Sequence, residues 1–584
     1  MSPGPALRRR ALLAGAAGSV AATGGCVGEL RNLAGRDRYR QLSLSIASVP
    51  ASHDTHAIRV ANALRENLER AGVDADVTPK SPDVLRRDVL VNHDFDLYVG
   101  RYPSEGRPDE LRTLLHSTYG GEAGWQNPFG FSSVAVDDLL AEQRAVAGEK
   151  RAAVVDEIQR RAVELQPFTV VAFGDRIAAA RTDRFDGWPA GGPTRLSDYL
   201  RVERTGDDRT LRPTVGDVRP TRNRNPIAVE HRSRSRVTDL LYEPLLRRPA
   251  DAPVPWLART VEWETDPLTA TVTLRETPWH DGRPVAPSDV AFTYAFLADT
   301  SLGGMDTPVP TPWRRGAVSL VDDAAVVDGD VRLAFATDHR EVARRALSVP
   351  ILPEHVWSEY VGAADVAGVD VAEGTTEALV RSNEDPVGSG PLRFVAADPD
   401  RSLTLERFEP HFLYGDDTDG IPGPLAEPPA FDRVAFTVAP SDDAAAELLE
   451  AGEADVTADG IGAGRLPRVS RTEGLELLLA RAEPFYMVGY NCRRPPLSNE
   501  RFRRVVARLL DRESLVSASF RGYADAAEAP LRPPWTPEGL AWDGTAELPF
   551  LGEAGALDVE AARAAFREAG YQYDGDRLVT RGAG

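Results

Sequence analysis

Alternating and helical hydrophobic patterns divide the first part of the chain into strands and amphipathic helices. Residues 42–49 (LSLSIASV) alternate between apolar and polar positions and predict a strand. In residues 57–71, Val60, Leu64 and Leu68 repeat at helical spacing, which predicts a helix that ends at Gly72. Further strands are expected at 73–77, 95–100 and 168–173. This order of strands and helices is typical of an α/β lobe.

A second section begins near Leu211 and is organised around residues 271–298. Its first residues alternate and predict a strand, and the chain then turns at residues 278–282 (PWHDG). We expect the following helix to start after Ser288, because serine is a favourable N-cap residue. Beyond it, strands are predicted at 392–396, 402–408, 432–438 and 485–491, and helices at 441–450, 499–511 and 558–569.

Composition narrows the classes of function. The chain has 584 residues with a formal net charge of −21 at pH 7. Such an acidic surface argues against nucleic-acid binding, which depends on lysine and arginine neutralising phosphates. It is typical of a protein kept soluble in high salt, so the surface is interpreted as that of a halophile. The alternative is an acidic protein without adaptation to salt.

The first residues have the features of an export signal. Arg8, Arg9 and Arg10 precede a short, weakly hydrophobic stretch, which resembles a twin-arginine signal. Residues 23–26 (TGGC) resemble a lipobox, in which Cys26 would be lipidated after cleavage, although Thr23 replaces the usual larger aliphatic residue. The alternative is a plain signal peptide with an incidental cysteine. Residues 27–41 are polar and predict a tether.

A series of short motifs runs through the second section, from Leu211 to Gly584. They are NP at 225–226, LYEPL at 241–245, WLA at 256–258, WHDGRP at 279–284, SDV at 288–290, DPVGSGP at 385–391, YN at 490–491, RFRRVV at 501–506, PPW at 533–535 and ARAAFREAGY at 562–571. In this order they resemble the motifs of family 5 extracellular solute-binding proteins, the peptide and nickel receptors of ABC importers. Together with its first residues, the chain resembles a haloarchaeal-like lipoprotein of this family.

The resemblance also implies an unusual order of segments. In the family, the ARAAFREAGY helix is followed by further strands and helices that here lie at the front of the chain, in residues 42–190. We therefore expect a circular permutant of a two-lobed, periplasmic-binding-protein-like α/β fold (type II) with an extra subdomain. The alternative is that residues 42–205 form an unrelated domain. The expected parts are a signal at 1–26, a tether at 27–41, lobe two at 42–172 and 486–584, lobe one with hinge segments at 173–223 and 385–485, and an additional subdomain of lobe one at 224–384.

The family resemblance also implies which residues contact the ligand. The segment after residues 95–100 should line the interlobe cleft with Arg101, Tyr102, Glu105 and Arg107. Peptide-binding relatives usually carry a tryptophan and then an acid before proline in this segment, where the present chain has Arg101 and Arg107. Glu105 could replace that acid, or the two arginines could bind a carboxylate or phosphate, or they could be solvated surface residues. Further candidates are Trp125, Asn127, Tyr490 and Asn491.

The sequence contains no motif of a known catalytic class. HExxH, GxSxG, P-loop and CxxC patterns are absent from the chain. His53 and His56 flank Asp54, but a third metal ligand is not evident, and neither a metal nor a cofactor is expected. The predicted function is a lipid-anchored, extracytoplasmic and monomeric receptor at the outer face of the plasma membrane, which delivers a peptide or similar small polar solute to an ABC permease. Alternatives are a sensory or scaffold lipoprotein and, less favoured, a surface hydrolase.

Overall fold

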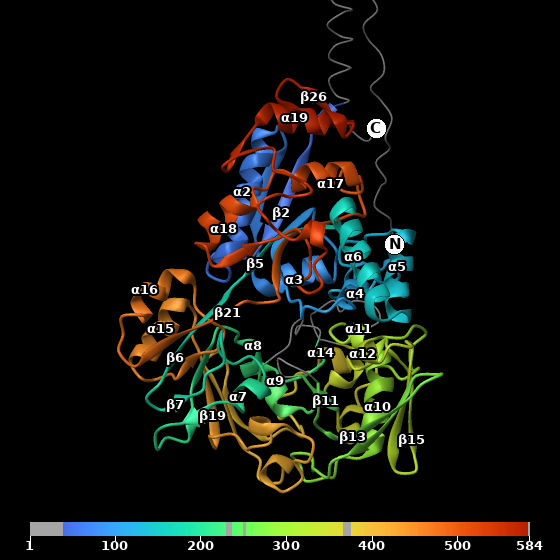
Figure 1. Ribbon diagram of the computed structural model, residues 1–584, viewed down its shortest axis with the longest axis vertical. Coiled ribbons are helices and arrows are strands. Elements are labelled where there is room, and N and C mark those ends of the chain that lie inside the picture. The colour runs from blue at the N-terminus through green and yellow to red at the C-terminus, as the bar shows by residue number, and fades with distance from the viewer. Residues whose placement is uncertain (1–38, 229–235, 249–252, 366–374, 582–584) are drawn as a thin grey trace, which may run out of the picture.

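The computed structural model describes residues 39–228, 236–248, 253–365 and 375–581. Their strands and helices form two lobes joined by two chain crossings (Figure 1). One crossing runs from β5 (Phe168–Gly174) to β6 (Arg176–Arg181), and the other from β21 (Leu475–Ala480) to β22 (Phe485–Tyr490). In the described part of the chain, no helix is both long and apolar enough to cross a membrane.

The upper lobe is built around a six-stranded sheet that takes strands from both ends of the chain. Its order is β23-β5-β22-β4-β2-β3. The strands β2 and β3 run parallel, whereas β22 runs antiparallel between β4 and β5. Blue and red segments therefore lie together in this lobe (Figure 1). The remaining bounds are β2 Ser43–Ser48, β3 Asp74–Pro79, β4 Leu97–Tyr102 and β23 Ala524–Ala526.

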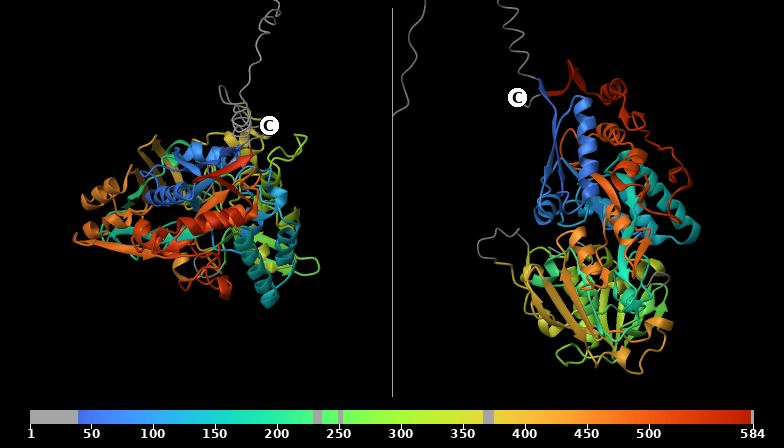
Figure 2. Two further views of the ribbon diagram at one scale, coloured as in Figure 1. Left: turned by 90° about the horizontal axis from the view of Figure 1, so that it is seen from above. Right: turned by 90° about the vertical axis from the view of Figure 1, so that its left-hand side faces the viewer.

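Helices cover both faces of the upper sheet. Apolar residues of α2 pack on one face, and Figure 2 shows this long helix lying beside the strands. The helices α4, α5 and α6 cover the other face with a separate apolar cluster. The bounds are α2 Thr55–Arg70, α3 Pro82–Leu90, α4 Glu110–Leu115, α5 Val134–Ala145, α6 Gly148–Leu165, α17 Glu500–Ala507, α18 Arg512–Phe520 and α19 Val559–Glu568.

The lower lobe contains an eight-stranded sheet and a four-stranded sheet. The larger sheet has the order β17-β18-β19-β10-β20-β6-β21, with β9 beside β19. The smaller sheet, β13-β14-β16-β15, is packed against α10 and belongs to the segment expected to form the extra subdomain. Remaining bounds are β9 Thr210–Leu211, β10 Pro213–Val215, β13 Ala258–Glu264, β14 Thr269–Leu274, α10 Pro287–Ala298, β15 Val321–Val327, β16 Asp330–Phe335, β17 Leu392–Asp398, β18 Ser402–Arg407, β19 Arg433–Val438 and β20 Val456–Thr457.

The strand predictions for the upper lobe are confirmed to within a few residues, but the prediction of Ser288 as the N-cap of the following helix is wrong. The helix α10 begins two residues earlier than predicted, at Pro287, with Ala286 as its N-cap. Proline suits the first turn because it has no N–H to leave unpaired. The Asp289 carboxylate accepts the Ala286 N–H at 2.8 Å and the indole N–H of the buried Trp279 at 3.1 Å.

Two of the sequence motifs contact each other in the lower lobe. The His280 N–H donates to the Gly388 carbonyl at 2.7 Å, and the His280 ring lies 3.0 Å from the Gly390 carbonyl. A Cβ atom at position 388 would lie 2.0 Å from the Leu241 carbonyl oxygen, so this approach requires glycine. The motif at 279–284 and the motif at 385–391 therefore form one packing unit, in which His280 has a structural role.

The two ends of the described chain pair with each other at the edge of the upper lobe. The strand β1 (Tyr39–Gln41) runs antiparallel to β27 (Arg577–Arg581), with Tyr39 opposite Arg581. The strand β26 (Gln572–Asp574) completes this small sheet. A few residues would therefore be enough to connect Arg581 to Tyr39, the two ends of the described part of the chain.

Candidate functional site

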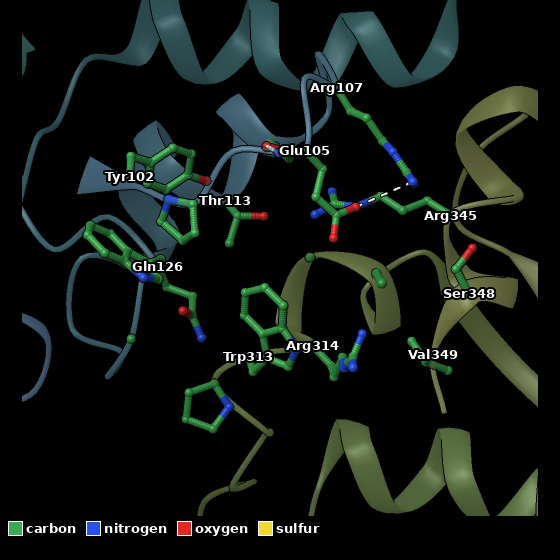
Figure 3. A pocket seen from close by; sticks show the side chains of 17 residues that line it. Tyr102, Glu105, Arg107, Thr113, Gln126, Trp313, Arg314, Arg345, Ser348 and Val349 are labelled. Atoms are coloured by element: carbon green, nitrogen blue, oxygen red, sulfur yellow. Dashed lines mark hydrogen bonds and ion pairs between the residues drawn. The ribbon is translucent and has the colours of Figure 1, made fainter. Parts of the chain in front are cut away.

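A cavity lies between the upper lobe and the segment expected to form the extra subdomain (Figure 3). From the upper lobe, Tyr102 at the end of β4 and Glu105 and Arg107 in the following loop line this cavity. The Trp125 ring meets the Tyr102 ring edge-on, with centroids 5.2 Å apart at 87°. With Glu110, which also lines the cavity, the upper wall therefore combines aromatic surface with two acidic side chains and one basic side chain.

The lower wall comes from residues 312–317 and 345–349. Trp313 and Arg314 face the upper lobe in Figure 3, and Arg345 reaches towards Glu105. The wall can approach closely because residue 316 is glycine: a Cβ atom there would lie 2.4 Å from the Thr113 hydroxyl. The cavity is therefore a site that only the joined lobes can form.

Among the hydroxyl and indole groups of the residues that line the cavity, three are buried and have no hydrogen-bond partner among the described residues. They are the Thr113 hydroxyl, the Trp313 indole nitrogen and the Ser348 hydroxyl. A buried polar group without a partner costs about 1–3 kcal/mol, so such groups are expected to meet a ligand or water. The indole N–H can only donate, and it would suit a carbonyl or carboxylate oxygen.

The charges at the upper wall are closely spaced. Arg107 lies 3.4 Å from the Glu105 carboxylate, and burial lowers the pKa of Arg107 to about 10 although Glu105 opposes the shift. The buried Glu110 carboxylate accepts the Glu105 N–H at 2.9 Å and the Ser104 hydroxyl at 3.1 Å. Burial, and then the nearby charge of Glu105, raises the pKa of Glu110 to about 7.

A buried ion network fixes the two walls to each other beside the cavity. The Asp109 side chain is buried, with the residue 3% exposed. Its carboxylate accepts hydrogen bonds of 2.5 and 2.9 Å from Arg144, which belongs to the same lobe, and one of 2.6 Å from Arg345, which belongs to the opposite wall. Burial alone would raise the pKa of Asp109, but the two arginines outweigh it and hold the pKa at about 2. A second ion pair, between Arg315 and Glu122 at 3.0 Å, joins the same walls.

The structure brings four of the predicted contact residues together in the cavity. Tyr102, Glu105, Arg107 and Trp125 all line it. Arg101, the neighbour of Tyr102 on β4, is not among the lining residues. Cys26 lies outside the described residues.

The other three candidates are buried and bonded to the protein itself, so we no longer propose them as ligand contacts. The Asn127 amide bonds to the main chain of Phe131, and the Asn491 amide donates to the Phe95 carbonyl at 2.8 Å. The Tyr490 hydroxyl lies 2.6 Å from the Thr169 hydroxyl inside the lobe. These polar groups stabilise loops and strands around the site.

Several residues of the cavity were not predicted from the sequence. Thr113, Gln126, Trp313, Arg314, Arg345 and Ser348 line it as well. A tryptophan between one proline and two arginines at 312–315 (PWRR) was the available signal, but it lies about 200 residues from the upper wall. Only the tertiary fold brings the two stretches together.

The histidines beside Asp54 have structural surroundings. The His56 ring stacks on Phe520 with centroids 4.6 Å apart and bonds to the Ser519 carbonyl at 2.8 Å. Within the described ranges, no group of three histidine, cysteine or acidic side chains is placed to hold a metal ion. The absence of a bound metal remains a prediction of the sequence.

The fold and the cavity define a class of protein: a two-lobed α/β protein with a site between its lobes. Residues 252–582 match the model of the bacterial extracellular solute-binding proteins, family 5, over more than half of the chain. The protein therefore belongs to this family of solute-binding proteins.

Individual relatives are distant. The chain is 24% identical over 268 residues to the oligopeptide-binding protein AppA of Bacillus subtilis, covering 45% of the chain and 42% of that relative. It is 27% identical over 298 residues to the peptidoglycan-binding protein YepA of Agrobacterium fabrum, a match that covers 47% of this chain and 43% of that relative. The matched part thus spans less than half of each relative's length. The solved structure of B. subtilis AppA with a nonapeptide is 18% identical to this chain and superposes with a TM-score of 0.45. The match covers 65% of this chain and 68% of that chain.

Proposed function

We propose that the protein is the solute-binding receptor of an ABC importer, which captures a peptide or similar small polar solute between its lobes and delivers it to a membrane permease. The observation that carries this proposal is the interlobe cavity in a chain of the solute-binding family. The relatives named for oligopeptide and peptidoglycan binding support a ligand of this chemical kind. Lobe closure around a ligand is a standard motion of such two-lobed proteins.

The chemistry of the cavity suits a small zwitterionic solute. Glu105 and Glu110 can bind an ammonium group, and Arg107 and Arg345 can bind a carboxylate. The Trp313 and Trp125 rings offer apolar faces, and the unpaired Thr113 and Ser348 hydroxyls can bond to amide groups.

Thermal unfolding in high salt against a panel of peptides, sugars and carboxylates tests the receptor function. A ligand at one hundred times its Kd should stabilise the folded protein by about 2.7 kcal/mol. Trp313→Ala should weaken binding at least tenfold, because it removes an aromatic face and a hydrogen-bond donor at the centre of the cavity. Trp542→Ala, outside the cavity, is the matched control and should bind as the wild type does. A panel without any stabilising solute would instead favour a sensory or scaffold lipoprotein.

We also propose that the chain is a circular permutant, with 42–172 and 486–584 as lobe two, 173–223 and 385–485 as lobe one, and 224–384 as the additional subdomain. Two observations support the permutation. The upper sheet combines strands from residues before the family match with strands inside it. In addition, the two ends of the described chain pair through β1 and β27.

A reordered gene tests the permutation. Residues 207–581 would be placed before residues 39–206, with a short Gly/Ser linker between Arg581 and Tyr39. The new ends fall in the exposed connection between β8 (Glu203–Arg204) and β9. We expect a folded protein whose free energy of unfolding lies within about 1 kcal/mol of the natural order, because all sheets are retained. A control opened between Val171 and Ala172, inside β5, should fail to fold. Equal failure of both would contradict the proposal.

We propose that Cys26 is lipidated after twin-arginine export and anchors a monomer at the outer face of the membrane. The motif at 23–26 and the arginines before it support this. Mass spectrometry of the purified amino terminus tests it: an unmodified Cys26 would contradict the anchor.

A further inference from the structure

We propose that Arg101, Arg176 and Arg236 form an anion-binding site that joins the two lobes on the face of β4 opposite the cavity. This inference deepens the proposed receptor function, because it assigns an anionic group to the ligand or to a second solute. We call these three residues the interlobe arginines.

Strand pairing places Arg101 at the lower end of the upper sheet, and Arg176 begins the strand that continues the chain from this sheet into the lower lobe. In the sheet register, Arg101 lies opposite Tyr486 of β22, and Tyr486 lies opposite Ala172 of β5. The chain then leaves β5 at Gly174 and starts β6 of the lower lobe at Arg176. Two strand spacings of about 4.8 Å separate β4 from β5, so the two arginines lie across the gap between the lobes.

The interlobe arginines are distinct from the cavity already described. Successive side chains of a strand point to opposite faces, and Tyr102, the next residue of β4, lines the cavity. Leu97 and Val99 share the face of Arg101 and belong to the apolar cluster under α2, whereas Tyr98 and Tyr102 belong to the cluster under α4–α6. The two sites thus lie on the two sides of one strand.

Among the described residues, no carboxylate forms an ion pair with Arg101 or Arg176, although Asp54 acts on Arg101 and Asp198 acts on Arg176 at longer range. Within the described ranges, Arg101 has neither a hydrogen bond nor an ion pair. Arg176 donates only to main-chain carbonyls, those of Gly191, Pro193 and Ala458. These bonds use its Nε and Nη2 atoms and hold the guanidinium in one orientation, leaving Nη1 for another partner. A guanidinium that is held in one orientation and keeps a donor nitrogen for another partner can form one side of an anion-binding site.

The neighbouring acids are already occupied. Asp54 accepts the N–H groups of His56 and Ala57 and the Tyr486 hydroxyl. Asp459 holds Arg236 and also accepts the Gly216 N–H. Asp198 accepts the N–H and hydroxyl of Thr194.

The electrostatic effects indicate an excess of positive charge at Arg176 and Arg236, whereas Tyr486, and after it Asp54, raise the pKa of Arg101. Burial, and then the charges of Arg236 and Arg101, lower the pKa of Arg176 to about 9. Burial also lowers the pKa of Arg236. Like charges from two lobes repel each other unless an anion lies between them, and guanidinium groups bind carboxylate and phosphate through paired N–H donors. A local positive site in a chain of net charge −21 would concentrate anions where the rest of the surface repels them.

Isothermal titration calorimetry of the full chain with inorganic phosphate and with succinate, at one fixed high KCl concentration, tests the site. We expect at least one of the two anions to bind, and the better one distinguishes a phosphate from a carboxylate ligand. Arg101→Gln and Arg176→Gln should each weaken binding at least tenfold. Arg87→Gln, which changes an exposed arginine of α3 with 63% side-chain exposure, is the matched control and should bind within twofold of the wild type.

The outcomes separate this inference from the receptor function. Anion binding that survives both Arg→Gln variants, or that is absent for both anions, overturns the interlobe site. Thermal unfolding of each variant shows whether it remains folded, and a variant that does not fold is replaced by Arg101→Lys, which keeps the charge but loses the forked donors. Trp313→Ala should bind the anions as the wild type does, because it alters only the cavity. Loss of panel ligands in Trp313→Ala together with retained anion binding would therefore support both sites independently.

Discussion

Replacing Asp109 by asparagine should lower the free energy of unfolding by about 3–5 kcal/mol. The substitution removes the only carboxylate that the described residues place against Arg144 within 4 Å, and it leaves two guanidinium groups in a buried position. Breaking one side of a buried ion network is costly because the remaining charge is neither paired nor hydrated. Urea denaturation at constant high salt measures the loss.

A surface ion pair provides the control for this prediction. Asp398 pairs with Arg401 at 3.6 Å, with side chains 56% and 80% exposed. Asp398→Asn should therefore change the free energy of unfolding by less than about 1 kcal/mol. A similarly small effect of Asp109→Asn would contradict a tightly paired network.

In addition, Arg345→Ala should increase the radius of gyration in solution scattering, because it releases the lower wall from Asp109.

The second large effect is a dependence of stability on pH that originates at Glu110. A pKa raised from 4.5 to about 7 means that the native state binds more protons than the unfolded state between these values. The contribution of Glu110 to the free energy of unfolding must therefore fall as the pH rises from 4.5 to about 7, by about 3 kcal/mol in total. The contribution is fully present below pH 4.5 and is lost above pH 7.

Glu105→Gln should reduce this pH dependence, because it removes the second cause of the raised pKa. Between pH 5 and pH 8, we expect the wild type to lose about 1 kcal/mol more stability than Glu105→Gln. Chemical denaturation at both pH values measures the difference. Glu149→Gln, which changes an exposed acid at the start of α6, should behave as the wild type does. Equal losses in the wild type and in Glu105→Gln would show that Glu105 does not act on Glu110.

Much of the upper lobe was predictable because its strands are short apolar runs with turn residues at their ends. Residues 168–173 and 485–491 were expected as strands and occur as β5 and β22. What periodicity does not show is which strands are neighbours: β22 lies between β4 and β5, which come more than 300 residues earlier. The start of α10 was missed because a proline and an acid compete with Ser288 at that turn.

The site was predictable on one wall only. Tyr102, Glu105, Arg107 and Trp125 follow a buried strand, and loops after such strands are where clefts form. Asn127 and Asn491 have equally polar side chains, but they satisfy main-chain groups inside the lobe, which the sequence does not show. The opposite wall depends on tertiary contact between distant segments.

The central position of β22 has a consequence for how the protein is made. While the ribosome synthesises the chain, β4 and β5 emerge early, but the strand that fits between them ends only at Tyr490. The gap is roughly 300 residues, which takes roughly 15–60 s at about 5–20 residues per second. During that time β4 and β5 have unpaired edges, and the apolar cluster under α2 lacks the later helices α17, α18 and α19. The lobe that is translated first is therefore completed last, and its nascent strands need protection from aggregation until then.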